Sequence, residues 1–236
     1  MDFSQYKFRC SALHVLAMEP KDKAAKEAGE LSATAKQHLC EVYAEAVYDY
    51  ERKESNKYFE KGTRVEEQSI TLLSSSIGEP LFKNTERLTN DWITGEWDIC
   101  TDIVYDVKSS WDLISHLKKR MEQTPQAYVW QIQGYLMLLR DMKGLDLPGG
   151  KLAHCLVDTP DEIIESEVRR MKYSYPSLSE QEEEEYRRTF KFDYVPLKHR
   201  VFTRAIFKSE SNIAAIPSMV EKGRKFLQDL HNMQNL

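Results

Sequence analysis

The chain has 236 residues, of which 41% are hydrophobic and 11% aromatic, so it can bury one substantial core. Its net charge of −5 excludes a protein that coats nucleic acid through a global positive field, and any such surface must be a local patch. The sequence has no run of about 18 apolar residues, no apolar segment behind Lys7 and Arg9 and no C-x-x-C pair among its four cysteines. We therefore expect a cytoplasmic protein without a secretory leader, membrane span, zinc knuckle or iron–sulfur cluster.

The first half of the chain is predicted to begin with helices and to continue with strands. One helix covers residues 31–50, and a polar break at residues 51–56 separates it from the next. The pattern then changes to short β-rich runs at residues 87–94, 96–100 and 103–108. We interpret these runs as an antiparallel meander.

The second half is predicted to alternate between helices and strands. Its elements are a helix at 126–142, a strand at 151–158, a charged helix at 161–172, a loop at 173–177, a solvated acidic helix face at 182–185, a strand at 200–208 and a terminal helix. This order predicts a mixed α/β (α+β) fold in one domain. We divide it into a helical N-terminal region (1–54), a core (55–160) and a C-terminal extension (161–236).

The triplet Asp106-Val107-Lys108 ends an apolar strand. The period of two places Asp106 and Lys108 on one face, with Val107 turned toward the core. A hairpin would bring Asp98 across from Tyr105 or Asp106, within roughly 5 Å by ordinary sheet pairing. Two carboxylates that close repel each other unless a cation lies between them, and hard oxygen ligands suit Mg²⁺ or Mn²⁺. The alternative is a charged surface on which Lys108 is an ion-pair partner.

A third carboxylate is predicted to point inward from the helix upstream. Phe59, Ile70 and Leu73 form the apolar face of that helix, and the spacing places Glu66 with them, whereas Glu67 falls on the polar side. An unpaired buried carboxylate costs several kcal/mol, so Glu66 needs a cation, a lysine or strong donors. A structural ion pair would satisfy it as well.

The helix at residues 126–142 is apolar nearly all round, which predicts burial on most sides. Gln131 and Tyr135 are four residues apart and therefore share a face of it. A buried glutamine amide must be hydrogen-bonded, and one aimed at the carboxylates could orient a ligand, a water or a phosphate oxygen. The alternative is a core glutamine that caps nearby backbone.

Together these motifs resemble the PD-(D/E)XK nuclease superfamily, specifically its phage lambda exonuclease, YqaJ and RecB-like branch. The family pattern is G-x-x-x-E, an Asp, D/E-x-K and Q-h-x-x-Y. It is matched in order, over about residues 55–160, by Gly62 with Glu66, by Asp98, by Asp106-Val107-Lys108 and by Gln131 with Tyr135. Trp97 stands where the family name has proline, which is common in this branch. The resemblance implies a restriction-endonuclease-like core, with a central mixed β-sheet flanked by helices and helical additions at both ends.

The resemblance also implies a function, namely a metal-dependent DNA nuclease of the phage exonuclease type that hydrolyses linear double-stranded DNA in recombination or DNA processing. One or two Mg²⁺ or Mn²⁺ ions would be held by Glu66, Asp98, Asp106 and the carbonyl of Val107. Catalytic roles would fall to Asp106, Lys108 and Gln131. The implied partners are DNA, further copies of the chain in a ring trimer and a single-strand annealing protein, in the host cytoplasm if a phage encodes the chain.

DNA contacts are expected close to the D-x-K strand. The candidates are Ser109, Ser110, Trp111, Tyr135, Lys118, Lys119 and Arg120. Loop capping, core packing and an ordinary solvated basic face explain these residues equally well. Two other functions remain open at this point. They are an inactive DNA-binding or assembly module of the same fold, and a helical interaction protein whose acidic residues 182–185 contact a partner.

Overall fold

The computed structural model describes residues 1–50 and 57–234, and its strands form two mixed sheets. The predicted polar break at residues 51–56 lies outside the described residues. The sheet of order β1-β3-β2 consists of β1 (Phe8–Arg9), β2 (Leu88–Thr89) and β3 (Ile93–Gly95). The sheet of order β4-β5-β6-β7 consists of β4 (Ile99–Cys100), β5 (Val104–Ser109), β6 (Gly149–Cys155) and β7 (Val201–Phe207). The β1/β3 and β5/β6 pairs are parallel, and the other pairs are antiparallel.

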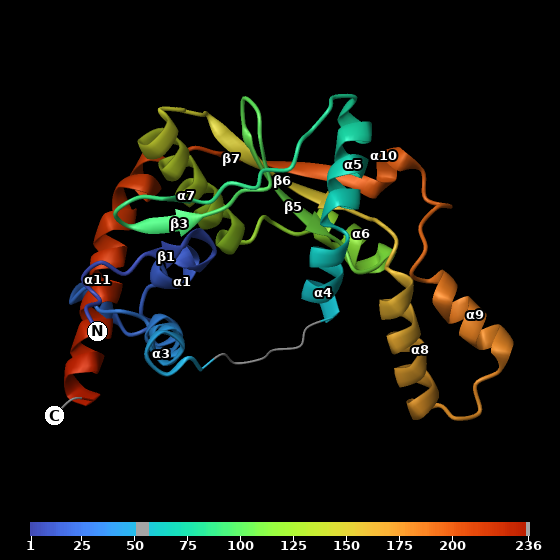
Figure 1. Ribbon diagram of the computed structural model, residues 1–236, viewed down its shortest axis with the longest axis horizontal. Coiled ribbons are helices and arrows are strands. Elements are labelled where there is room, and N and C mark those ends of the chain that lie inside the picture. The colour runs from blue at the N-terminus through green and yellow to red at the C-terminus, as the bar shows by residue number, and fades with distance from the viewer. Residues whose placement is uncertain (51–56, 235–236) are drawn as a thin grey trace.

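Helices surround these sheets on both sides (Figure 1). In chain order they are α1 (Leu13–Leu16), α2 (Lys23–Glu27), α3 (Ala33–Tyr48), α4 (Lys57–Arg64), α5 (Glu66–Ile77), α6 (Leu113–Met121), α7 (Gln126–Lys143), α8 (Asp161–Ser174), α9 (Glu180–Arg188), α10 (Leu197–Arg200) and α11 (Glu210–Gln234), with a 3₁₀ turn at Cys10–Ala12. Local sequence determines where several helices begin or end. The Ser32 hydroxyl caps α3, Asp112 and Ser115 form a capping box on α6, and Gly144 ends α7 at φ 68°. No helix within the described residues is long and apolar enough to cross a bilayer.

Strand β5 lies between two helices, and this arrangement positions the site. Ile70 and Leu73 of α5 pack with Val107 on one face of the strand. Helix α7 covers the other face, where Ile132 joins the larger cluster that contains Val104. The alternation predicted for the D-x-K strand is therefore present, with Val107 in the core under α5 and its neighbours on the α7 side.

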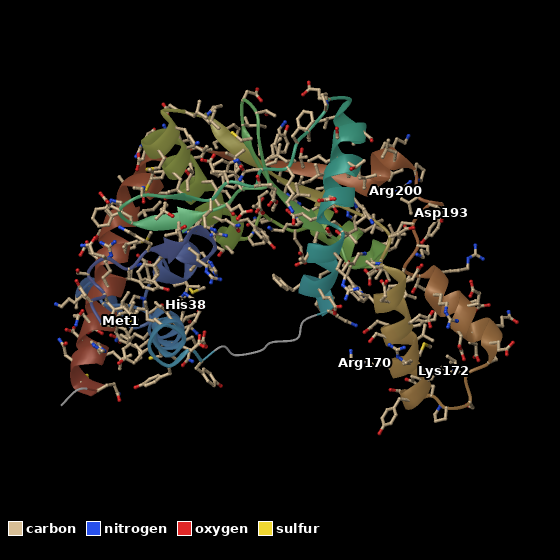
Figure 2. All side chains as sticks on the ribbon, viewed as in Figure 1. Met1, His38, Arg170, Lys172, Asp193 and Arg200 are labelled. Atoms are coloured by element: carbon tan, nitrogen blue, oxygen red, sulfur yellow. The ribbon has the colours of Figure 1, made fainter. Side chains whose placement is uncertain are left out.

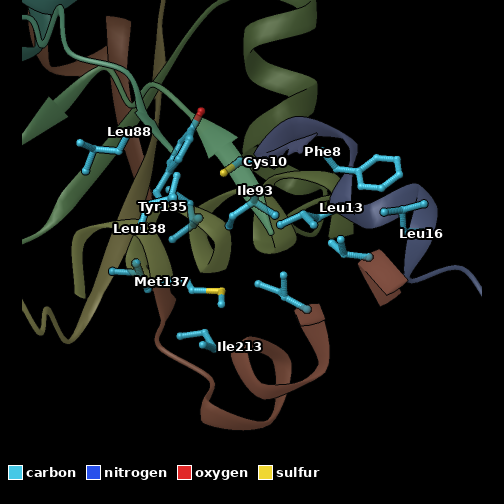
Figure 3. Packing of buried hydrophobic residues seen from close by; sticks show 14 of the residues in the cluster. Phe8, Cys10, Leu13, Leu16, Leu88, Ile93, Tyr135, Met137, Leu138 and Ile213 are labelled. Atoms are coloured by element: carbon cyan, nitrogen blue, oxygen red, sulfur yellow. The ribbon is translucent and has the colours of Figure 1, made fainter. Parts of the chain in front are cut away.

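Helix α7 approaches the N-terminal 3₁₀ turn very closely, and glycine permits this approach. A Cβ atom on Gly134 would lie 2.8 Å from Leu13 Cδ1 and 2.9 Å from Cys10 Sγ. Figure 3 shows Cys10 packed among Ile93 and Leu13 in the large apolar cluster. The contact holds α7 against the 3₁₀ turn, which directly follows β1 of the three-stranded sheet.

Some predicted boundaries of strands, loops and the core were wrong. Residues 87–94 form two strands instead of one, because the Asn90 side chain accepts the Trp92 and Ile93 amides, both at 2.9 Å, and turns the chain between β2 and β3. The sheets also include β1 and β7, so the core extends beyond residues 55–160. The predicted loop at 173–177 starts too early, since α8 continues to Ser174.

The acidic segment at 182–185 lies on α9, and Glu182, Glu184 and Glu185 are exposed as predicted. Glu183 is buried instead, and it pairs with Lys172 of α8 at 2.6 Å and with Arg187 at 3.6 Å. Glu183 therefore helps to hold α9 to α8.

We predict that Gly134→Ala lowers the free energy of unfolding by about 1–3 kcal/mol, because the new methyl group overpacks the contact with Cys10 and Leu13. Gly62→Ala is the matched control, since a Cβ there meets nothing within 4 Å and should stabilise α4 by about 0.5–1 kcal/mol. Urea denaturation measures both variants. Equal or greater stability of Gly134→Ala than of the wild type would contradict the packing described above.

Candidate active site

An ion pair between Asp106 and Lys108 lies at the end of β5. Asp106 is only 1% exposed, and the Lys108 ammonium donates to its Oδ1 at 2.9 Å and lies 2.8 Å from its Oδ2. Burial raises the pKa of Asp106 despite this ammonium. Burial alone would lower the pKa of Lys108, but the charges of Asp106 and Asp98 outweigh it and raise that pKa. Oδ2 is buried against this ammonium but receives no well-aligned hydrogen bond from the described residues.

Asp98 lies beside this pair on the neighbouring strand, as predicted. The register pairs Ile99 with Tyr105, so Asp98 is placed opposite Asp106, and its Oδ2 accepts the Val107 amide at 2.5 Å. Burial, together with the charge of Asp106, raises the pKa of Asp98 to about 7. Two desolvated carboxylates thus share one small site.

Helix α7 supplies a hydrogen-bonded support for the ion pair. Gln131 Nε2 donates to Asp106 Oδ1 at 3.2 Å and to the Tyr135 hydroxyl at 2.6 Å. Tyr135 is 4% exposed, and Figure 3 shows its ring among Leu88 and Leu138. The predicted contact of Tyr135 with DNA does not fit this burial, because the side chain packs in the core and fixes Gln131.

Glu66 is less buried than the spacing predicted. It is the first residue of α5, its side chain is 28% exposed, and it pairs with Lys83 at 3.0 Å. The prediction treated α4 and α5 as one helix, but the chain breaks at Val65 (φ −111°, ψ 13°). For the same reason Phe59 does not join the apolar face with Ile70, and is 77% exposed.

A cleft of about 420 Å³ opens over these groups. It is lined by Tyr58, Phe59, Gly62, Thr63, Glu66, Asp98, Val107, Lys108, Ser109, Lys119 and Tyr128. The structure thus brings together residues from α4, α5, β5, α6 and α7, with Asp106 buried beneath Lys108. Within residues 1–50 and 57–234, no three His, Cys, Asp or Glu side chains meet as a ready metal site, and Glu66 is turned to Lys83.

Of the serines and basic residues predicted to contact DNA, Ser109 and Lys119 line the cleft. Ser110 does not, because it is fully buried and its hydroxyl bonds with His116 Nδ1 at 3.0 Å. Lys118 is exposed and lies 3.7 Å from Glu122.

Arg120 and Trp111 make contacts within the protein. Arg120 donates to the carbonyls of His199 and Val201, at 3.2 and 3.0 Å, and so ties α6 to β7. Trp111 packs edge-on against Tyr58 and Phe190, with ring centroids 5.2 and 5.6 Å away. The prediction that Trp111 stacks on a base does not fit this packing.

The sequence reasoning missed the cleft residues Tyr58, Thr63 and Tyr128, and Lys83, the partner of Glu66. Tyr128 lies three residues before Gln131 on α7, and the Lys108 ammonium is 5.4 Å from its ring centroid. That helical spacing was a usable signal. Lys83, the partner of Glu66, comes from an irregular segment, and no pattern in the sequence pointed to it.

Comparison with known proteins assigns the family. No family model and no curated protein matches the chain. Among solved structures, a phage-related exonuclease from Haemophilus somnus 129PT is 30% identical, with a TM-score of 0.75 over 98% of this chain and 97% of that one. The chain belongs to the phage-related exonuclease family. The predicted resemblance to the phage exonuclease branch of the PD-(D/E)XK nucleases and the predicted fold class are confirmed.

Two further structures share the exonuclease fold at low identity. An alkaline exonuclease (LHK-Exo) from Laribacter hongkongensis is 12% identical, with a TM-score of 0.57 over 98% of this chain and 93% of that one. The same enzyme in complex with dAMP is 12% identical, with a TM-score of 0.58 over 97% and 91%. The fold of the family therefore extends over nearly the whole chain.

The raised pKa of Asp98 predicts a pH effect on stability. Because the native state holds this proton more tightly, stability should fall as pH rises from about 4, the usual carboxyl value, to about 7. Asp98→Asn lacks this titration, so wild-type stability should decline relative to the variant across that window. Urea denaturation in chelator, at several pH values, measures the difference. Parallel stability curves for the two proteins would contradict the burial of the carboxylate.

Proposed function

We propose that this exonuclease-family chain is a divalent-metal-dependent deoxyribonuclease that degrades linear double-stranded DNA from its ends. The observation that carries the proposal is the Asp106–Lys108 pair beside Asp98 at the floor of the cleft. The exonuclease neighbours, one of them in complex with dAMP, support a nucleic acid substrate. A ring trimer and a single-strand annealing partner remain predictions from the family.

The donor set fits a hard divalent cation. Asp98 and Asp106 are desolvated carboxylates that repel each other, and Asp106 Oδ2 has no well-aligned donor among the described residues. Val107 and Glu66 line the same cleft and could add a backbone carbonyl and a carboxylate, for which Lys83 would have to release Glu66. These oxygens suit Mg²⁺ or Mn²⁺. When bound, such an ion stabilises charge on a phosphoryl oxygen and lowers the pKa of a bound water.

The chain's own side chains have defined tasks in this proposal. Lys108 holds a proton on Nζ at the cleft surface, where it can orient the attacking water or donate to a phosphate oxygen. Gln131 fixes Asp106 and is itself fixed by Tyr135. The reacting groups are therefore held in place before substrate arrives.

The rim of the cleft suits a DNA end. Lys119 and Ser109 line the cleft, and an ammonium or a hydroxyl group can contact phosphate oxygens. Tyr58 and Phe59 line it as well and are exposed, and aromatic rings stack on unpaired bases. The rim thus offers contacts for both the backbone and the bases of a strand end.

We predict that Lys108→Met lowers the Mg²⁺-dependent rate on linear duplex by about a thousandfold or more without unfolding the protein. Lys143→Met is the matched control, because Lys143 pairs with Glu86 on the surface and lies outside the cleft. Release of nucleotides from linear and covalently closed circular duplex is measured with Mg²⁺ and with Mn²⁺. Digestion of the linear form alone is expected.

Three outcomes would count against the proposal. Failure of the wild type to digest DNA with either metal ion would favour an inactive DNA-binding or assembly module of the same fold. Equal cutting of circular DNA would favour an endonuclease, and full activity of Lys108→Met would remove the lysine from the chemistry.

A further inference from the structure

Helix α4, which carries Tyr58 and Phe59 at the rim, is anchored in an unusual way. No apolar side chain of α4 is buried, and its buried residue is Lys61. Lys57, Lys61 and Arg64 recur at helical spacing away from the cleft-lining residues. Cations therefore attach the rim of the cleft to the rest of the molecule, where an ordinary helix would use an apolar face.

Lys61 is the innermost of these three cations. It is 1% exposed, and its ammonium donates to the Trp111 carbonyl at 2.9 Å. The ammonium also lies 5.2 Å from the Phe192 ring centroid and 5.9 Å from that of Trp111. Burial lowers the pKa of Lys61 to about 7, although the charges of Asp158 and Asp112 oppose the shift. Burial of the ammonium is energetically costly. It places one hydrogen bond between α4 and the segment that follows β5.

Trp111 is the point at which the rim meets the catalytic strand. It follows β5 by two residues, and its ring packs edge-on against Tyr58 of α4 at 5.2 Å. Lys57 lies over the same ring at 4.7 Å and pairs with Glu167 of α8 at 2.6 Å. Figure 1 shows α4 extending from α5 on the side of α8.

The Arg64 contact of α4 is weaker than those made by Lys61 and Lys57. Arg64 and its partner Glu162 of α8 are 3.6 Å apart, and both side chains are largely exposed. Figure 2 shows that α8 also carries the charged side chains Arg170 and Lys172. Exposed ion pairs contribute little to stability, so α4 is held mainly by the buried Lys61 contact and by the Lys57–Glu167 pair, of which Glu167 is buried.

We propose that Lys61 is a positioning residue for substrate: by tying α4 to the Trp111 carbonyl, it holds the aromatic rim, Tyr58 and Phe59, in place over the cleft. This inference rests on the proposed function, because the rim matters only if the cleft receives a strand end. The role concerns binding and leaves the chemical step alone, since Asp106 and Lys108 are held by the sheet and α7. Glu66 is held separately, because α5 has its own apolar anchor.

The test compares Lys61→Met, Phe59→Ala and the double variant on linear duplex. We expect Lys61→Met to raise KM about tenfold, the scale of one lost hydrogen bond to a charged group, and to change kcat by less than about twofold. Phe59→Ala should raise KM similarly, and the double variant should raise KM by less than the product of the two single effects, because the ring lost in Phe59→Ala is one of the two that Lys61 holds. Lys61→Arg should restore part of the loss.

Arg224→Met is the matched control. Arg224 is also buried, donates to the Tyr6 carbonyl at 3.0 Å and lies 5.1 Å from the Trp92 ring centroid, but it is not among the cleft residues. It should leave KM unchanged even where it lowers stability. If Lys61→Met does not fold, Lys57→Met, which removes a half-exposed contact of the same helix, should raise KM by a smaller factor.

The outcomes separate this inference from the proposed function. An unchanged KM, a loss confined to kcat, or additive effects in the double variant would overturn the role of Lys61. Affinity for a fluorescently labelled duplex end, measured in chelator, is the second readout. If the wild type binds DNA and cuts none, the proposed function fails. The positioning role is then tested by affinity alone: weaker binding of the duplex end by Lys61→Met supports it, and unchanged binding overturns it.

Discussion

The burial of one carboxylate determines much of this structure. Asp106 is almost inaccessible to water, and an isolated charge there would cost several kcal/mol, so it requires an adjacent cation and a donor. Lys108, two residues along the same strand, supplies the cation, and Gln131 supplies the donor. Gln131 can do so only because α7 lies close over β5, and Gly134 permits α7 to pack closely on the N-terminal turn. Packing and site chemistry therefore constrain each other.

The same burial gives the site its chemical capacity. Asp98 and Asp106 share a desolvated corner in which each charge raises the energy of the other, and a divalent cation would relieve that repulsion. The groups proposed to act on DNA differ in how they are attached. The carboxylates and the lysine stand on a packed sheet, whereas the aromatic rim stands on a helix held by cations. Different interactions thus position the groups proposed for the chemical step and those proposed to bind the strand end.

The sequence was informative where a local period controls the structure. Alternation along a strand correctly separated Val107 from its neighbours, and the four-residue spacing correctly placed Gln131 with Tyr135. It failed where distant segments decide the outcome. The helical periodicity predicted one continuous helix across Val65, because no residue there signals the break between α4 and α5. Phe59 was therefore placed in the core. Ser110 was a candidate DNA contact, with loop capping as the alternative, because its partner His116 reaches it only through the packing of α6 on the sheet.

Calorimetric titration with Mn²⁺ at neutral pH tests the central claim most directly, namely that the buried carboxylates form a cation site. We predict binding to the wild type and its loss in Asp106→Asn. Asp102→Asn is the control, since Asp102 is exposed at the tip of the same hairpin and should leave binding unchanged. Absence of binding to the wild type, or equal binding to Asp106→Asn, would contradict the account.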